Sequence, residues 1–176
     1  MAALHHDRGG IDELLDSISL FLKGSYDVVG VVVDADASLA DQWTRVRDRF
    51  AAQGGERPPR TSAHGTVVAA NVGQVRRVGV WIMPTNDTDG MLEDLLAMLV
   101  PPGDPVWPIA ERATSDAMTA GAKLRPAHQS KGCIHAYLAW QERSGMPFGT
   151  ALTAEVLLHD EAIAKHIVQW LRNLYA

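Results

Sequence analysis

The sequence predicts an α/β domain, and two observations lead to that class. Strand-like runs rich in β-branched residues alternate along the chain with amphipathic helical segments, which is the order typical of α/β folds. The clearest strand candidate is the apolar, valine-rich run at residues 28–33, which ends abruptly in Asp34-Ala35-Asp36. A short and continuously apolar run of this kind is typical of a strand buried on both faces in a parallel sheet.

Length and composition favour a single domain spanning residues 1–176. The chain has 176 residues, of which 47% are hydrophobic, enough to bury a sizeable core. It contains no apolar run of about 18 to 20 residues, the length that a membrane-spanning helix needs. Its N-terminus lacks the apolar segment of a signal peptide, and its single cysteine, Cys133, excludes a disulfide framework. We therefore expect a cytoplasmic protein.

The elements around the valine-rich run follow from helical periodicity and turn residues. Leucine and isoleucine recur at three- and four-residue spacings before Gly24, which predicts a first helix that ends there. After the run, Ser38 and Asp41 resemble a helix-capping box, and the helix that they open has one apolar face. The segment 54–64 is rich in glycine and proline, so we expect a loop.

The remainder of the chain predicts two more strands followed by helices. The strands are expected at residues 66–70 and 78–83, with a polar turn at residues 71–77 between them. Helices are predicted over roughly residues 91–99, 105–120, 130–140 and 163–174.

Asp34 and Asp36 are candidate metal ligands. They lie one residue apart at the C-terminal end of the predicted strand, where open α/β sheets bind their ligands. Side chains at i and i+2 of an extended segment point the same way, and two nearby carboxylates repel each other unless a hard cation such as Mg2+ compensates them. The alternative is structural: Asp34 ends the strand and Asp36 begins the following turn.

Glu93 could complete this metal site. It lies in the first turn of the helix that follows the strand at residues 78–83, where an acidic side chain also suits the helix dipole. That turn is expected at the same edge of the sheet as Asp34 and Asp36. Asp87 and Asp89 in the preceding loop could also approach, although Asp89 is expected to cap the helix.

Lys131 is a candidate catalytic residue. If Ser130 caps the next helix, Lys131 falls at its first position, where the helix dipole mildly disfavours a cation. A lysine there can share a bound phosphate with the free backbone amides. The alternative is a lysine that simply faces solvent.

Positive charge is concentrated in residues 45–77 of an otherwise acidic chain. This segment has seven arginines against two acidic residues, a balance of +5, whereas the whole chain carries −5. Arginine suits bidentate phosphate contacts, and a basic patch can bind a polyanion whatever the net charge. Unless the segment is only a solvated surface, we expect phosphate or nucleic-acid contacts from Arg45, Arg49, Arg57, Arg60, Arg76 and Arg77.

With these residues in view, the sequence resembles the Toprim superfamily, and more closely an uncharacterised prokaryotic Toprim-related family similar to the OLD-type nuclease Toprim domain. The motifs that carry the resemblance are VVVDAD, WIMPTNDTDGMLEDLL and SKGCIHAYLAW, within a similarity that covers nearly the whole chain. The resemblance implies a mostly parallel central sheet flanked by helices. It also implies Mg2+ (or Mn2+) held by Asp34 and Asp36, Glu93 as a further metal-binding acid, and Lys131 as a lysine used in strand cleavage.

One part of the Toprim pattern has no counterpart here. Toprim proteins begin with a strand that ends in a glutamate, and Glu13, inside the first helix, is a poor substitute. Three explanations are open: a start upstream of Met1, a partner that supplies the strand, or loss of catalysis. The resemblance thus implies either a metal-dependent nuclease acting on DNA or RNA, or a catalytically silent binding or regulatory subunit. An uncovered strand edge would favour self-association or pairing with a partner protein.

Overall fold

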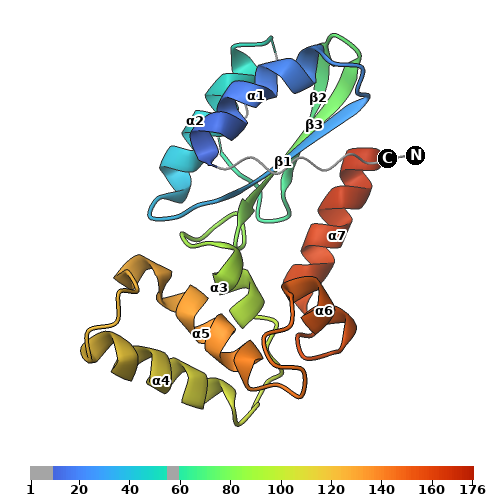
Figure 1. Cartoon of the computed structure of the whole chain (residues 1–176). Coiled ribbons are helices and arrows are strands. Elements are labelled where there is room, and N and C mark those ends of the chain that lie inside the picture. Colours follow the sequence, from blue (N-terminus) through green and yellow to red (C-terminus); the bar gives the residue numbers. More distant parts are fainter. Residues whose placement is uncertain (1–9, 55–59) are drawn as a thin grey trace.

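The computed structural model describes residues 10–54 and 60–176, and it shows a mixed α/β fold with a small sheet flanked by helices (Figure 1). Arg57, one of the predicted phosphate ligands, lies outside the described residues. The strands are β1 (Val28–Asp34), β2 (Thr66–Val72) and β3 (Val75–Met83). The helices are α1 (Ile11–Lys23), α2 (Leu39–Ala51), α3 (Leu92–Ala97), α4 (Trp107–Thr119), α5 (Gln129–Ala139), α6 (Phe148–Thr153) and α7 (Ala162–Tyr175), with a short 3-10 helix, η1 (Pro126–His128).

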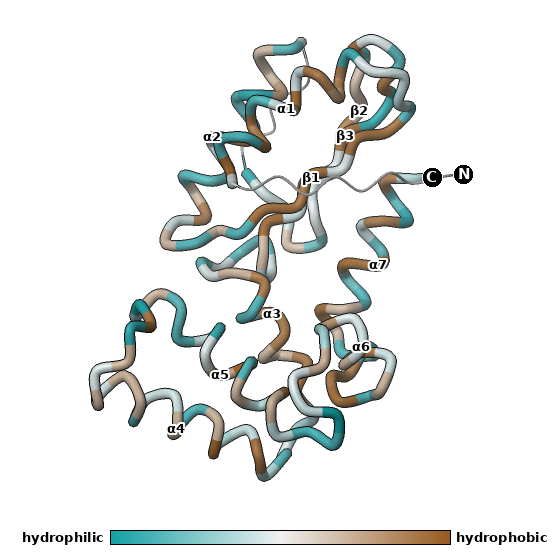
Figure 2. Tube along the Cα trace, in the orientation of Figure 1, coloured by the Kyte–Doolittle hydropathy of each residue, from teal (hydrophilic) through white to brown (hydrophobic). Residues whose placement is uncertain are grey.

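The chain forms two regions that α7 connects. Helices α1 and α2 cover one face of the sheet, α3 to α6 form a helical layer beyond its end, and α7 returns along the other face (Figure 1). Hydrophobic residues are concentrated along β1 and β3, whereas hydrophilic residues recur along the helices (Figure 2). Within the described ranges, no helix has the length and apolar character needed to cross a membrane.

The sheet has the strand order β1-β3-β2 and is parallel in only one of its two pairings. β1 pairs with β3 in parallel, but β2 and β3 form an antiparallel hairpin. The expectation of a mostly parallel sheet is therefore not met, and the predicted turn at residues 71–77 is too long. The strands continue through that segment because its polar residues face outward, and Gly73, with a φ of 59°, permits a tight connection.

The expectation that the valine-rich strand is buried on both faces is wrong. β1 lies at an edge of the sheet, and its residues alternate between buried and more exposed positions. Val29, Val31 and Val33 pack into the core shared with α1 and α2, but the side chain of Val32, on the other face, is 47% exposed. The reason is that α7 lies mainly over β3, so the second face of β1 is only partly covered.

Two glycines in the sheet lie directly beneath α7 and allow it to pack closely. Gly30 and Gly79 are direct partners across the β1–β3 pairing, and a Cβ atom at either would lie 2.9 Å from a methyl carbon of Leu174. A Cβ atom at Gly79 would also come within 3.1 Å of Trp170. The Trp170 indole N–H donates to the carbonyl of Thr66 at 3.2 Å. Absent side chains on two neighbouring strands therefore let α7 approach the sheet closely.

This close approach predicts the effect of Gly79→Ala. The added methyl group must displace Leu174 or Trp170, so we expect a loss of unfolding free energy on the order of 1–3 kcal/mol, measured by urea denaturation. Gly149→Ala is the matched control, because Gly149 lies in α6 with open space around its Cα, and alanine is the better helix former. Equal stability of the two variants would contradict the packing role of Gly79.

Candidate functional site

Asp34 ends β1 and joins the sheet to the helical layer. It is paired in register with Met83, the last residue of β3. Its Oδ1 atom accepts a hydrogen bond of 2.9 Å from the backbone N–H of Leu92, the first residue of α3. A carboxylate at this position satisfies one of the unpaired donors of the helix N-terminus and suits the helix dipole.

The electrostatic surroundings of Asp34 bring together the residues predicted for the metal site. Burial raises the pKa of the Asp34 carboxyl above its ordinary value, and the nearby carboxylates of Asp36 and Glu93 raise it further. The N–H of Leu92 and the ammonium of Lys131 act in the opposite direction, but the net shift is upward. Asp34 is therefore a partly buried acid whose charge its neighbours only partly compensate.

Asp36 reaches the same site through a turn rather than an extended strand. Its φ of 53° is left-handed, so the expectation that Asp34 and Asp36 align on one extended segment is wrong. Two backbone hydrogen bonds between Asp36 and Gly90, of 2.8 and 2.9 Å, hold this turn against the loop before α3. Both carboxylates nevertheless line one cavity of ≈ 490 Å³, together with Gln42 and the start of α1.

Glu93 and Lys131 form an ion pair between α3 and α5. The Lys131 Nζ atom lies 3.1 Å from Glu93 Oε1, and the Glu93 side chain is only 8% exposed while that of Lys131 is 51% exposed. α5 begins at Gln129, with His128 at the cap position, so the expected cap by Ser130 is wrong. Lys131 still lies in the first turn, where Glu93 offsets the unfavourable helix dipole.

The other aspartates of this region, Asp87, Asp89 and Asp94, accept hydrogen bonds away from Asp34 and Asp36. Asp89 Oδ1 accepts a 2.7 Å hydrogen bond from the N–H of Leu39, so it caps α2 rather than the helix that follows it. At the start of α3, Asp94 Oδ2 accepts from the N–H of Met91 at 2.8 Å. Asp87 accepts a hydrogen bond from the hydroxyl of Thr85.

The donor atoms at the cavity suit a water-rich magnesium site better than a closed metal cage. In residues 10–54 and 60–176, no group of three or more His, Cys, Asp or Glu side chains could hold a metal ion together. Asp34 Oδ2 and Asp36 Oδ1 accept no hydrogen bond from any described residue. Mg2+ commonly uses one or two carboxylates and keeps several waters, so this pair fits such an ion.

The predicted phosphate-binding arginines do not form one patch around the cavity. Arg45 pairs with Asp12, Arg49 with Asp16 and Arg76 with Asp27. Arg76 and Arg77 lie at the start of β3, and the strand rise of about 3.3 Å per residue places them roughly 20 Å from the Asp34 end. Arg60 is exposed in the loop before β2. Of these, only Arg45 is connected to the site by hydrogen bonds.

Gln42 is the site residue that the sequence did not single out. It lies on α2, is 7% exposed, and its Nε2 atom donates to Asp36 Oδ2 at 3.3 Å. A signal was present, because Gln42 stands beside Trp43 and four residues before Val46 on the otherwise apolar face of α2. A polar side chain on a buried helix face requires a polar partner.

The comparison with protein families shows to which family the chain belongs. The family described as "Protein of unknown function (DUF3226)" matches residues 2–176. The chain belongs to this family. No curated protein and no solved structure matches it. The description of DUF3226 names no activity, so the resemblance to Toprim proteins stays a prediction.

The raised pKa of Asp34 predicts how stability changes with pH. The folded protein holds this proton more tightly than the unfolded chain, so stability falls as pH rises through the raised pKa. Asp34→Asn removes this effect while its amide oxygen can still accept from Leu92. We expect the metal-free variant to be more stable than the wild type at pH 7, with a difference that shrinks toward about pH 4.

Urea denaturation from pH 4 to pH 8 in the presence of a chelator measures this difference. Asp160→Asn is the control, because Asp160 is exposed in the loop before α7 and far along the chain from the cavity. A variant at Asp34 that is less stable than the wild type at pH 7 would contradict the assigned burial and charge repulsion.

Proposed function

We propose that the chain is a Toprim-like, Mg2+-dependent phosphodiesterase, a nuclease acting on DNA or RNA, with its site at the C-terminal end of β1. The observation that carries the proposal is the partly buried Asp34 carboxyl, held beside Asp36 and Glu93 at the end of a strand in a parallel pair. Perturbed acids of this kind are concentrated at functional sites. Open α/β sheets bind ligands at this end of their strands.

A divalent cation would offset the repulsion between Asp34 and Asp36. Each residue has a carboxylate oxygen without a hydrogen-bond donor among the described residues, and both line the cavity. When bound, the ion would polarise the scissile phosphate and lower the pKa of an attacking water. The carboxylates of Asp34 and Asp36 would hold the ion in place, because hard oxygen ligands suit Mg2+ or Mn2+ better than softer metal ions.

Lys131 would stabilise the charge of the bound phosphate, and Glu93 would orient the Lys131 side chain. The Lys131 side chain is half exposed, so its ammonium can contact a ligand while Glu93 Oε1 holds it at 3.1 Å. A positioned cation beside a phosphate stabilises charge that develops during hydrolysis. The contact of the buried Glu93 carboxylate with Lys131 favours this role for Glu93 over the role of third metal ligand.

The second candidate function is a catalytically silent binding or regulatory subunit. It is favoured by the edge position of β1 and by the lack of a third carboxylate able to share a metal with Asp34 and Asp36 in the described part of the chain. A partner protein, or a second copy of this chain, would then pair with β1 and could add the missing glutamate.

Metal binding and hydrolysis separate these candidates. We expect Mg2+ or Mn2+ to raise the unfolding free energy by about 2.7 kcal/mol at 100 times its Kd, and to support cleavage of fluorescent DNA or RNA oligonucleotides. Asp34→Asn/Asp36→Asn should lose both effects. Lys131→Met should keep the metal effect but lose activity by about 100-fold or more, whereas Lys165→Met, on the exposed side of α7, should resemble the wild type.

The outcomes distinguish the two functions. Metal-dependent stabilisation without cleavage at any protein concentration supports the silent subunit. Specific activity that rises with protein concentration, together with light scattering of a dimer, supports a site completed by assembly. Absence of both stabilisation and cleavage with millimolar Mg2+ and Mn2+ would remove the metal-site proposal.

Nucleic-acid binding through the basic segment has its own test. If Arg60, Arg76 and Arg77 contact phosphates, binding should weaken as salt rises, with a slope of log K against log salt near −0.9 for each contact to duplex DNA. Charge reversal of Arg76 and Arg77 should flatten the slope by about two, measured by fluorescence anisotropy. A slope unchanged in that double variant would leave these arginines as a solvated surface.

A further inference from the structure

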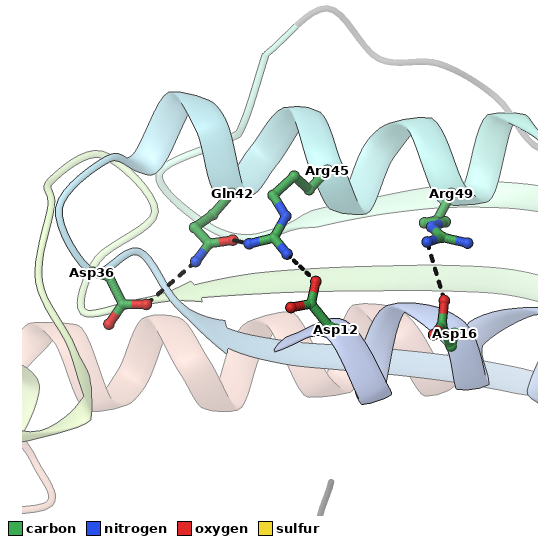
Figure 3. Close-up of polar contacts among 6 residues, drawn as sticks. All are labelled: Asp12, Asp16, Asp36, Gln42, Arg45 and Arg49. Atoms are coloured by element: carbon green, nitrogen blue, oxygen red, sulfur yellow. Dashed lines mark hydrogen bonds and ion pairs between the residues drawn. The ribbon is translucent and has the colours of Figure 1, made fainter. Parts of the chain in front are cut away.

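A relay of hydrogen bonds runs from the cavity to the first turn of α1. Gln42 Nε2 donates to Asp36 Oδ2 at 3.3 Å, and Gln42 Oε1 accepts from Arg45 Nη1 at 3.2 Å. The other terminal nitrogen of Arg45 forms an ion pair with Asp12. Figure 3 shows these four side chains in a line between α2, α1 and the turn after β1.

The relay has a fixed direction because of the chemistry of arginine. A glutamine amide has a donor end and an acceptor end, and either can face a given neighbour, whereas a guanidinium group only donates. Arg45 therefore requires the oxygen of Gln42 on its side. The NH2 group must then face Asp36, which must accept.

We propose that Gln42 and Arg45 are positioning residues that hold Asp36 in the orientation needed for cation binding, with Arg45 acting through Gln42 rather than on a bound phosphate. This inference rests on the proposed function, because it assumes that Asp36 is a ligand of the cation. It gives Arg45 a role different from the phosphate contact that its residue type suggested.

Asp36 needs such support because its backbone contacts do not fix its side chain. Two backbone hydrogen bonds to Gly90 hold the left-handed turn, but Asp36 itself is exposed. Repulsion from Asp34 would turn its carboxylate away from the cavity, and the Gln42 amide opposes that rotation by holding Oδ2. Oδ1 is then left free for a ligand. Outer residues that orient metal ligands in this way commonly change metal affinity when they are replaced.

Burial determines which part of the relay matters most. Gln42 is 7% exposed, so water competes poorly for its hydrogen bonds. The side chains of Arg45 and Asp12 are 38% and 87% exposed, and such surface ion pairs contribute little by themselves. Removal of Arg45 should therefore weaken cation binding, because it frees the buried Gln42 to rotate, whereas removal of the Asp12 charge should have a small effect.

The chain contains a matched control for Arg45. Arg49 lies one turn later on α2 and pairs with Asp16 on α1 at 3.1 Å, in the same way that Arg45 pairs with Asp12 (Figure 3). Arg49 has no hydrogen bond to Gln42 or Asp36 in the described residues. A general effect of losing an ion pair between α1 and α2 would appear equally in both variants.

The first measurement tests, without metal, the direction of the hydrogen bond from Gln42 to Asp36. Gln42→Glu places a second acceptor against Asp36, so we expect a lower melting temperature in chelator. Adding Asp36→Asn to this variant supplies an amide donor at position 36 and should recover most of the loss, by reversing the direction of that hydrogen bond. Asp36→Asn alone is measured beside it, because loss of that charge also relieves repulsion from Asp34, so the gain in melting temperature must be larger in the Gln42→Glu background than in the wild type.

The second measurement tests the consequence for the cation. Titration of Mn2+, followed by electron paramagnetic resonance, should give a Kd about 10-fold weaker for Arg45→Met than for the wild type. Arg49→Met and Asp12→Asn should stay within about twofold of the wild type. The full chain is used throughout, and circular dichroism confirms that each variant is folded.

The results separate failure of the relay from failure of the proposed function. Recovery of Gln42→Glu by Asp36→Asn, with no Mn2+ binding to the wild type, supports the relay and removes the cation site. Absence of that recovery overturns the relay, as does equal weakening of Mn2+ binding by Arg45→Met and Arg49→Met. Recovery together with selective weakening by Arg45→Met supports both.

Discussion

The hydrogen bond between the N–H of Leu92 and Asp34 is the interaction on which the arrangement of the candidate site depends. It joins the end of the sheet to the first residue of α3, and α3 in turn packs against α5. Asp34 thereby comes near Glu93 and Lys131, which lie 59 and 97 positions later in the sequence. The hydrogen bond from Leu92 favours the charged form of Asp34. It also holds the carboxylate in a place where burial, Asp36 and Glu93 disfavour that charge. These opposing effects leave Asp34 suited to a cation.

The parts of the fold that could be predicted are those determined by local periodicity. The apolar spacing identified α1, α2, α4 and α7 close to their observed bounds, and the valine-rich run identified β1. Strand direction and strand order could not be predicted in this way, because they depend on long-range pairing. Residues 71–77 look like a turn by polarity, yet Arg76, which is exposed, and Arg77, which is partly exposed, belong to β3.

The candidate site shows the same division between local and long-range information. Asp34, Asp36, Glu93 and Lys131 were all chosen as candidates by their places at strand and helix ends, and all contribute to the electrostatics around Asp34. Their contacts could not be predicted, since the Glu93–Lys131 pair and the capping of α2 by Asp89 join separate segments of the chain. Gln42 was missed because its importance comes from a partner that only the turn at Asp36 provides.

The basic segment illustrates why a local charge count does not define a binding surface. Two of its arginines, Arg45 and Arg49, lie opposite Asp12 and Asp16 of α1, so part of the positive charge is balanced where the two helices pack. Arg76 and Arg77 lie at the start of β3, at the far end of the sheet from the cavity, and Arg76 is itself paired with Asp27. Arg60 precedes β2, whose first residue pairs with Val80 near the other end of β3. A nucleic acid that contacted Arg76, Arg77 and the cavity would have to extend along the length of the sheet. Arg45 is therefore better explained as part of the relay that orients Asp36, because it already has two partners within the protein.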